Sequence, residues 1–501
     1  MTELNNVKEI GAPDVLVVGA GPTGLALALD LTRRGVRALV VERAGALFPG
    51  SRGKGLQPRT LEVLDDLGVG DAVREASAHA PIGLIWQDGR PAGEHDMLGD
   101  AGAGGPTETE PHPRARLLPQ WRTQEILFER LTGLGGRVRF GAALTGFDQD
   151  ADGVSAYLSD GSTVRAAYLV ASDGGRSTVR RALDIGMTGE TVDPAPMVVA
   201  DVRLRPGALD RDHWHLFPGP EGGFAALCPL PGTEEHQFVA RSETSTGRTD
   251  SADSPVSTAS GIPAAVAALT HLDAEDVLEV RWASDFRPRV ALADRFRTGR
   301  VLLAGDAAHV HSPAGGQGLN TSVQDAYNLG WKLGQVLRHG ADPALLDTYE
   351  EERRPVAAHV LGLSTRIHRG QEERGSATRQ LGLGYRDGPL SEGAAGALEA
   401  GDRAPDGPLP DGRRLFDLFR GPHFTLLAVG TDVELPPMRG EFAEFLRVHR
   451  IGPYEPYGKG LFLVRPDGYV GWAGEDATGL ERYLARLARP GTPVAETGAG
   501  S

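Results

Sequence analysis

The stretch that decides the fold is Asp14–Glu42, which reads DVLVVGAGPTGLALALDLTRRGVRALVVE. Its short apolar run, Val15–Val18, predicts a buried parallel strand. A leucine-rich helix is predicted to follow and to end at Gly35, and Val36–Val41 predicts a second strand. The order of strand, glycine turn, helix and strand is that of a dinucleotide-binding βαβ unit.

The turn of this unit carries glycines with the spacing G-x-G-x-x-G. One glycine makes the tight turn, one lets the backbone approach a pyrophosphate, and one lets the helix pack close to the strand. Glu42 follows at the distance where a carboxylate accepts hydrogen bonds from ribose hydroxyls. A glycine-rich turn in an ordinary α/β domain is the alternative, but both strands, the helix and the acid are in register. We therefore predict a dinucleotide site formed by Gly19, Ala20, Gly21, Gly24 and Glu42.

Composition narrows the class of protein. The chain has 501 residues, enough for roughly two to four domains. A net charge of −15 argues against nucleic-acid partners and anionic membrane surfaces. Cys228 is the single cysteine, so neither a disulfide within the chain nor a cysteine-based zinc site is possible. The sequence shows no signal peptide and no apolar run of about 18 residues, so we expect a cytoplasmic protein.

Two further blocks resemble ligand-binding turns. In Tyr168–Arg180, an apolar strand leads into Asp173, Gly174 and Gly175, and Ser177 or Thr178 is placed to cap the next helix. This is a second turn with phosphate-binding character.

The third block follows another predicted strand, Val301–Ala304. Gly305 and Asp306 end that strand, and a proline- and glycine-rich loop, 309–318, leads into a long helix predicted over 319–339. His309 and His311 in this block are candidate acid–base groups, although a histidine beside a loop is more often structural.

The segments between these blocks are less regular. Ser51–Gln57 is a glycine-rich basic loop that contains Arg52, and Gly89–Pro113 is predicted to be a long exposed loop or flap. Short β-like runs over 187–282 predict a mostly antiparallel sheet that forms one wall of a pocket. Its polar groups, His213, His215 and Arg241, are candidates for the pocket lining.

The C-terminal part begins with a helix predicted over Asp347–Val360, broken near Pro355. Residues 386–414 have the composition of a linker. A small unit then follows over 415–501, with a helix predicted over Glu441–His449 and a disordered tail.

Together, GAGPTG with Glu42, SDGG, and GDAAHVHSPAGGQGLN resemble the FAD-dependent aromatic hydroxylases, the single-component flavoprotein monooxygenases. The third block, followed by NTSVQDAYNLGWKL, is most similar to the subgroup that oxidises aromatic polyketides in antibiotic biosynthesis. This resemblance covers roughly residues 14 to 370. GDRAPD and LVRPDGYVGWAG resemble the thioredoxin-like C-terminal domain of the larger members.

The resemblance implies an α/β fold. A Rossmann-like FAD-binding domain would comprise 1–186 and 283–385, with an inserted, mostly antiparallel β-sheet substrate domain over 187–282. A linker over 386–414 would lead to a thioredoxin-like domain over 415–501. Since this last unit has no cysteine, thioredoxin chemistry is excluded there.

The resemblance also implies non-covalent FAD, NADPH or NADH as the reductant, O2, and no metal. Gly19, Ala20, Gly21 and Gly24 would hold the pyrophosphate, Glu42 the ribose, and Arg43 and Arg52 would contact the cofactor. Gln120 and Asp306 would face the ribityl chain, Asp173 and Gly174 would serve FAD and NAD(P)H, and Leu319 and Asn320 would present N–H groups to the flavin pyrimidine. Pro313, Gly316 and Gly318 would form a rigid wall beside the ring. The flavin would carry the chemistry, and the Pro313 loop is a catalytic candidate. Gln124 departs from the family, which often has an acid there.

The implied reaction is hydroxylation of a polycyclic aromatic through a flavin C4a-hydroperoxide, with the substrate between the flavin and the middle sheet. Baeyer–Villiger oxygen insertion by the same intermediate remains an alternative. A flavin-fold binding protein without redox activity is a second alternative, from a different class. The sequence leaves open the exact substrate, the choice between NADPH and NADH, and the oligomeric state, for which a dimer is one option.

Overall fold

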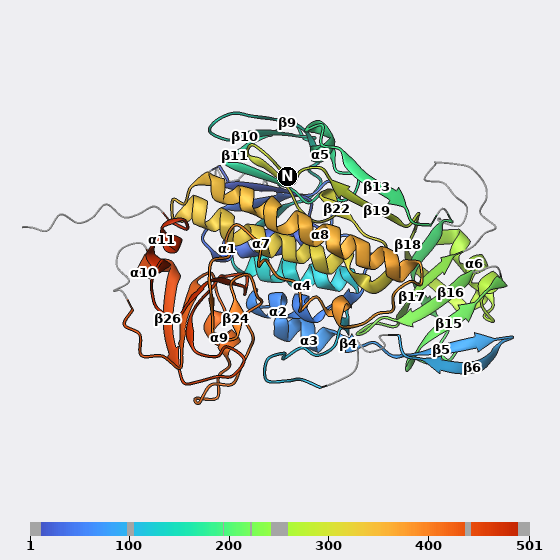
Figure 1. Ribbon diagram of the computed structural model, residues 1–501. Coiled ribbons are helices and arrows are strands. Elements are labelled where there is room, and N and C mark those ends of the chain that lie inside the picture. Colours follow the sequence, from blue (N-terminus) through green and yellow to red (C-terminus); the bar gives the residue numbers. More distant parts are fainter. Residues whose placement is uncertain are drawn as a thin grey trace, which may run out of the picture.

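The structure is a computed structural model that describes residues 12–97, 105–193, 195–220, 223–241, 259–435 and 442–488. Two long helices, α7 (Gly318–Arg338) and α8 (Asp347–His368), run through the middle of the molecule (Figure 1). The C-terminal unit, coloured orange to red, lies at one end, and a large green sheet lies at the other (Figure 1).

The central layer is a six-stranded, largely parallel sheet. Its strands run in the order β20 (Arg297–Thr298), β21 (Val301–Leu303), β12 (Tyr168–Ala171), β1 (Val15–Val18), β2 (Ala38–Val41) and β8 (Arg137–Arg139). All neighbours are parallel except β20 and β21. The predicted strands at both ends of the glycine unit are confirmed, and β1 lies between β12 and β2.

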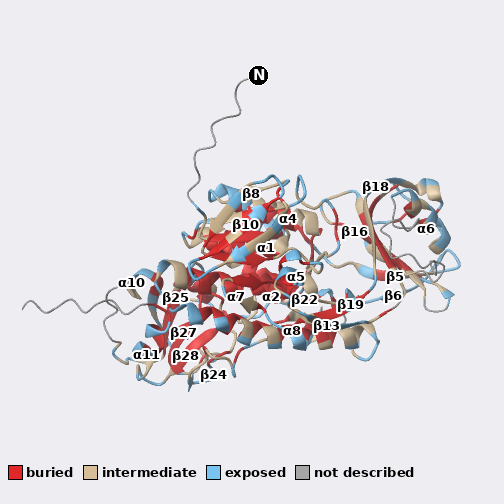
Figure 2. Ribbon diagram, turned by 90° about the horizontal axis from the view of Figure 1, so that it is seen from above, coloured by how far each residue is buried: buried red, intermediate tan, exposed pale blue. Residues whose placement is uncertain are grey.

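Helices cover this sheet and complete its core. α1 (Pro22–Arg33) follows the glycine turn and packs against α4 (Gln120–Gly133) and α7. Most of α7 is buried, because one side contacts α1 and the other contacts α8. Figure 2 shows the resulting buried interior in red around α1 and α7. The apolar strands and helices thus form one hydrophobic core that fixes the turns at the sheet edge.

Smaller elements surround this core. α2 (Pro58–Asp66) and α3 (Gly70–Ala76) pack on each other, and α5 (Thr178–Ala182) follows β12. Further strands form three small sheets. The first contains β3 (Gly55–Leu56), β7 (Arg116–Leu117) and β4 (Ala78–His79), and the second contains β9 (Leu144–Gln149), β10 (Val154–Leu158) and β11 (Thr163–Ala166). The third contains β13 (Met187–Thr191), β19 (Arg289–Ala293) and β22 (His309–Val310). β10 and β11 form an antiparallel hairpin, and Gly161 in its turn has φ +83°.

The large sheet has seven strands. In order they are β18 (Val277–Phe286), β14 (Met197–Leu204), β17 (Glu235–Arg241), β16 (Phe224–Pro229), β15 (His213–Pro218), β5 (Ile82–Gln87) and β6 (Arg90–His95). Five of the neighbouring pairs are antiparallel, and β15 pairs with β5 in parallel. One face packs on α6 (Ile262–Leu269) in a separate hydrophobic cluster.

This sheet differs from the expectation in two ways. It recruits the hairpin β5–β6 from residues 82–95 and continues to Phe286, so it extends beyond 187–282. The expected loop over Gly89–Pro113 is therefore wrong for its first part, where β6 forms although all its side chains are exposed. Backbone pairing with β5, rather than side-chain burial, stabilises this edge strand, so apolar pattern could not reveal it.

The C-terminal unit contains a four-stranded sheet. Its order is β26 (Leu446–Ile451), β25 (Phe424–Val429), β27 (Gly460–Val464) and β28 (Val470–Gly474), with β25 and β26 parallel and the other pairs antiparallel. The helices are α9 (Leu415–Phe419), α10 (Phe442–Phe445) and α11 (Leu480–Ala485). The helix predicted over Glu441–His449 is wrong beyond Phe445, because the chain turns into β26. The expected tail after residue 488 lies outside the described residues.

Residues 386–414, expected as a linker, pack on this sheet. They contain the short pair β23 (Ala394–Ala395) and β24 (Leu398–Glu399), and Glu392 and Arg403 form bridges to β28 and to the residue before it. A second correction concerns α8, which continues unbroken through Pro355 to His368. In the described part of the chain, no helix is long and apolar enough to cross a membrane.

Candidate cofactor and substrate site

The three sequence blocks meet at one edge of the parallel sheet. Gly19 follows β1, Asp173 follows β12, Asp306 follows β21, and Glu42 follows β2. These four strands are adjacent and parallel, so their carboxyl ends open on the same side. Ligands of open α/β sheets bind outside this edge.

The glycine turn fits close to its neighbours on one side and is open on the other. A Cβ on Gly19, which has φ +107°, would lie 2.4 Å from the Ser172 carbonyl oxygen. A Cβ on Gly24 would lie 2.0 Å from the Gly19 carbonyl oxygen. By contrast, a Cβ on Gly21 would meet no protein atom within 4 Å. Gly21 thus faces open space at the start of α1, where no side chain caps the helix, as anion binding by the helix N-terminus requires.

Glu42 stabilises this turn through hydrogen bonds. Its carboxylate accepts hydrogen bonds from the backbone N–H groups of Ala20 and Ala44, both at 2.9 Å. A carboxylate has about four acceptor positions, so these two bonds leave capacity for ribose hydroxyls. The neighbouring Arg43 is exposed.

The second turn is organised by Asp173. One of its carboxylate oxygens accepts from Thr178 N at 2.7 Å and Val179 N at 3.4 Å, while the buried Oδ1 has no partner. The Ser177 hydroxyl accepts from Arg180 N, which confirms a predicted cap of α5. Gly174, with φ +82°, has no neighbour within 4 Å of a built Cβ, so this turn is also open on one side.

Asp306 lies near basic side chains. Its side chain is exposed to solvent, yet desolvation by the surrounding protein raises the pKa of its carboxyl group. Arg52 lies within electrostatic reach of Asp306, Arg43 and Arg176. The guanidinium of Arg52 also lies 5.2 Å from the centre of the Phe48 ring. Charged groups from three turns therefore surround the same open space.

The N-terminus of α7 forms another side of this space. No side chain caps this helix, and Gly315 and Gly316 in the preceding loop have φ of +78° and +64°. Pro313 is exposed, and Gly318 lies beside His311. The uncapped N–H groups give this end a positive partial charge.

The side chain of Asn320 has a structural role that the sequence did not reveal. Its amide accepts from Gln57 N at 2.8 Å and donates to the carbonyl oxygens of Gly55 and Gly316 at 2.9 and 2.7 Å. Leu319 also lies against Gly53. Asn320 thereby joins the Pro313 loop to residues 48–57, which we name the bridging loop.

Two glutamines of α4 form hydrogen bonds with the backbone of the bridging loop. Gln120 Oε1 accepts from Gly53 N at 3.1 Å, and Gln124 Nε2 donates to Phe48 O at 3.0 Å. An amide at position 124 suits this contact because it can donate, which an ionised acid cannot.

His309 and His311 form a buried chain of hydrogen bonds. His311 Nε2 lies 3.0 Å from His309 Nδ1, and His309 Nε2 lies 2.5 Å from Asp325 Oδ2. Arg353 Nε donates to the other carboxylate oxygen of Asp325 at 2.7 Å. The pKa of Asp325 is about 2, because His309 and Arg353 outweigh the effect of burial. This chain ties the Pro313 loop to α7 and α8.

The residues present therefore fit FAD. An open glycine turn, an accessible carboxyl group beside arginines, and an uncapped helix end line one space at the sheet edge. All sixteen predicted cofactor residues lie on the turns and loops described above or, for Gln120, directly beneath them: Gly19, Ala20, Gly21, Gly24, Glu42, Arg43, Arg52, Gln120, Asp173, Gly174, Asp306, Pro313, Gly316, Gly318, Leu319 and Asn320. Their contacts with FAD stay a prediction.

The three polar groups of the large sheet that the sequence singled out already have protein partners. His215 Nδ1 accepts from Trp86 Nε1, and His213 bonds to Asp210, so both already have protein partners. Arg241 pairs with Asp193 at 3.1 Å. Asp201 and Gln237, which were not predicted, lie on the face toward the bridging loop. Alternation in MVVADVRL was the available signal, since it places an acid in a buried strand.

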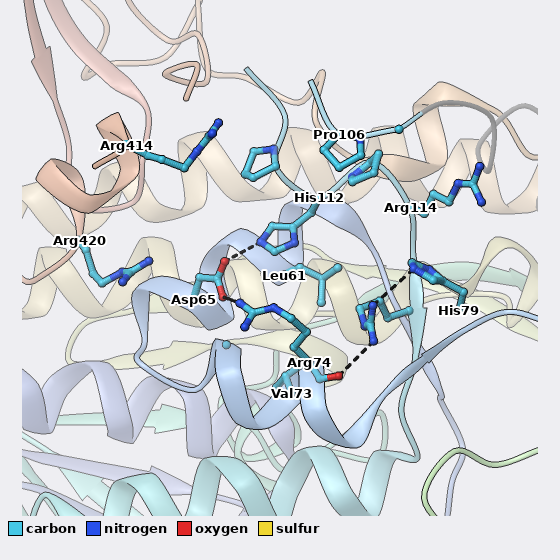
Figure 3. A pocket seen from close by; sticks show the side chains of 15 residues that line it. Leu61, Asp65, Val73, Arg74, His79, Pro106, His112, Arg114, Arg414 and Arg420 are labelled. Carbon is cyan, nitrogen blue, oxygen red and sulfur yellow. Dashed lines mark hydrogen bonds and ion pairs between the residues drawn. The ribbon is translucent and has the colours of Figure 1, made fainter. Parts of the chain in front are cut away.

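A separate cavity of about 610 Å³ lies between α2, α3, residues 105–116 and the C-terminal unit. Figure 3 shows His112 and Arg74 pointing toward Asp65, and Arg414 and Arg420 reaching over from the C-terminal unit. His112 bonds to Asp65 at 2.6 Å, Arg74 pairs with Asp71, and Arg414 pairs with Asp406. Acidic partners thus offset much of the positive charge of this cavity.

Cys228 is buried, and burial raises the pKa of its thiol to about 11, so it is not a nucleophile.

Comparisons with known proteins agree with this geometry. A family model described as an FAD binding domain matches residues 12–364, and one described as aromatic-ring hydroxylase, C-terminal, matches 398–490. The chain is 44% identical over 491 residues to a flavin-dependent monooxygenase of Mycobacteroides abscessus, covering 94% of this chain and 99% of the relative. It is 36% identical over 523 residues to the 12-dehydrotetracycline 5-monooxygenase/anhydrotetracycline 6-monooxygenase of Streptomyces rimosus, covering 93% and 96%. Among solved structures, a ternary complex of aklavinone-11 hydroxylase with FAD and aklavinone matches with a TM-score of 0.80 and 28% identity, covering 97% and 100%.

Proposed function

Because this chain belongs to the family of FAD-dependent aromatic hydroxylases, we propose that it is a monooxygenase that hydroxylates a polycyclic aromatic polyketide in antibiotic biosynthesis. NADPH or NADH would supply two electrons, and one atom of O2 would enter the ring while the other leaves as water. When bound, FAD would supply this redox chemistry, through the flavin hydroperoxide that the family resemblance implies. The single observation that carries the proposal is that the three motif turns meet at one edge of the parallel sheet, next to a bridging loop that also bonds to the large sheet.

The residues of the chain would bind and enclose the reactants. Gly21 and the N-terminus of α1 would accept the pyrophosphate, and Asp306 would accept hydrogen bonds from ribityl hydroxyls. The uncapped end of α7 would stabilise negative charge on the reduced ring. The bridging loop would separate the ring from solvent, which matters because the activated oxygen decays in contact with water.

The large sheet would provide the substrate wall. On its face toward the bridging loop, Val199, Ala226 and Val239 lie on neighbouring strands. Val199 and Ala226 are buried, yet they belong to none of the hydrophobic clusters that the described residues form. An apolar face that does not pack into a core suits a large planar ligand.

We further propose the four-part division of the chain given above, with a thioredoxin-like domain at the C-terminus. The supporting observation is the strand order, in which the first two strands are parallel and the last two antiparallel. Its role would be packing or contact between subunits.

The test is to incubate the FAD-loaded enzyme with NADPH or NADH, polycyclic phenols and isotopic O2. We expect NAD(P)H oxidation that the phenol stimulates, and a product carrying one labelled oxygen atom. Alkaline hydrolysis then separates a ring hydroxyl from the lactone of a Baeyer–Villiger reaction, because only a lactone opens. Efficient hydroxylation of single-ring phenols, with no binding of larger compounds, would contradict the proposed substrate class.

A further inference from the structure

Five side chains form a continuous row across the large sheet. Asp201 on β14 lies opposite Trp282 on β18 and Gln237 on β17, and Gln237 lies opposite Cys228 on β16. The register of β15 with β16 continues the row to Trp214. Directly opposed residues in antiparallel strands point to the same face. The row therefore presents a polar centre between two tryptophans.

This row faces the bridging loop and, beyond it, the cofactor site. Gln237 Nε2 donates to the Ser51 carbonyl oxygen, and its Oε1 accepts from Lys54 Nζ. Lys54 Nζ also lies 4.2 Å from the centre of the Trp214 ring. At the other end, the rings of Phe48 and Trp282 are 5.1 Å apart. Both amide atoms of Gln237 are thus engaged by the loop.

Asp201 is the acidic member of the row. Its side chain is 0% exposed, and neither carboxyl oxygen has a hydrogen-bond partner. Ser51 lies next to Asp201, and its hydroxyl and backbone N–H groups lower the pKa of the Asp201 carboxyl group, but no hydrogen bond of normal geometry joins the two residues. A buried carboxyl group without partners costs free energy, so its retention points to a ligand that supplies the missing bond.

The charges around Asp201 allow it to exchange a proton near neutral pH. Burial raises the pKa of its carboxyl group to about 7, Glu235 adds to the rise, and Ser51 and Lys54 oppose it. Lys54 in turn faces Cys228 and Arg374, and burial lowers the pKa of its amine. A general base works best when its pKa lies near the operating pH.

We propose that Asp201 is the base that accepts the proton of a phenolic hydroxyl group on the substrate, an inference that rests on the proposed function. A polycyclic ring lying along Val199 and Val239 would bring an edge hydroxyl group to Asp201, because all three point to the same face. The O–H bond breaks as the carboxylate takes the proton, and the phenolate becomes the more electron-rich nucleophile. A ring carbon then forms the new C–O bond while the O–O bond of the activated oxygen breaks. The ring carbon loses its proton to restore aromaticity, the second oxygen atom takes up a proton in its place and leaves as water, and Asp201 returns the first proton to the phenolate.

A binding experiment tests this step without turnover. Alizarin, a hydroxyanthraquinone whose colour shifts on ionisation, is added to the oxidised FAD-loaded enzyme in the absence of NAD(P)H. Because alizarin in water already ionises near neutral pH, the dye in buffer is the reference, and we expect the bound dye to ionise at a lower pH on the wild-type enzyme than on Asp201→Asn. Unchanged ionisation in Asp201→Asn, or ionisation on the wild-type enzyme at no lower pH than in buffer, would overturn the proposal.

Turnover supplies the second measurement. With a substrate found by the assay above, Asp201→Asn is expected to lower kcat by about 10²-fold at unchanged FAD content. Glu235→Gln serves as the matched control. It removes a nearby negative charge, so it should keep the maximal kcat and shift the pH profile toward acid. An enzyme that ionises alizarin but oxidises no polycyclic phenol would contradict the proposed function and leave the role of Asp201 supported.

Discussion

Arg465 of the C-terminal unit and Glu352 of α8 form a two-armed ion pair, with N–O distances of 2.6 and 2.9 Å, and neither side chain is exposed. Arg465 also bonds to Asp467, and Glu352 bonds to Lys332 at 2.7 Å. Burial alone would raise the pKa of Glu352, but Arg465 and Lys332 lower it to about 2. The C-terminal unit is therefore joined to the FAD-binding part through a buried charged network.

We expect Arg465→Ala to destabilise the whole protein by about 3–5 kcal/mol, because it leaves buried carboxylates without their partner. The free energy of unfolding from denaturant titration is the measurement. Arg482→Ala is the control, since the Arg482 side chain is 75% exposed in its pair with Glu392, and such pairs contribute about 1 kcal/mol or less. Equal losses of unfolding free energy in the two variants would show that the buried network contributes no more to stability than the exposed pair.

Two glycines of the first turn should give opposite results. Gly24→Ala would place a methyl group 2.0 Å from a backbone oxygen, so we expect a large loss of thermal stability even without FAD. Gly21→Ala meets no protein atom within 4 Å, and its backbone at φ −73° suits alanine. Gly21→Ala should therefore keep the melting temperature of the apoprotein and lower FAD occupancy. Full FAD occupancy in Gly21→Ala would mean that the pyrophosphate does not bind at Gly21.

Asp306→Ala should release most of the FAD. A charged hydrogen bond contributes about 1.5–3 kcal/mol, so FAD affinity should fall by roughly 10- to 150-fold for one bond. Asp306→Asn, which can still accept a bond, should lose less. Flavin absorbance after gel filtration gives the occupancy, with Glu279→Ala on the exposed edge of the large sheet as the control. If Asp306→Ala retains all its flavin, the assigned role of Asp306 is wrong.

The parts that the sequence predicted correctly depend on local pattern. β1, α1 and β2 follow from an apolar run, a helical repeat and glycines whose spacing has a steric reason at Gly19 and Gly24. β26 was mistaken for a helix because its pairing with β25 lies about twenty residues away in the chain. Pro355 was expected to break α8. The helix continues because Val356 and Val360, which lie about one turn apart after Pro355, are buried and stabilise it.

The residues predicted to hold FAD could be selected from the sequence, because most of them lie in motifs with a known spacing. Asp201, Gln237 and Lys54 come from three distant segments that only strand register and the bridging loop bring together. The acid in the run MVVADVRL is visible in the sequence, but no local pattern connects it with Gln237 and Lys54, so its proposed role could not be assigned from the sequence.

The last prediction concerns the pH dependence of stability. The pKa of the Asp201 carboxyl group is about 7 in the folded protein, against an ordinary value of 3.8. Between these values the folded state holds a proton that the unfolded state has lost, so this group makes the protein less stable as the pH rises from about 4 to 7. Asp201→Asn removes the effect. We expect the free energy of unfolding of Asp201→Asn, relative to the wild type, to increase by at most roughly 4 kcal/mol between pH 4 and pH 8. Asp212→Asn is the control, because this exposed side chain is solvated in both states and its curve should parallel the wild type. Parallel curves for Asp201→Asn as well would mean that Asp201 is ionised in the folded protein at pH 5, and its place in the row would then need a cationic partner.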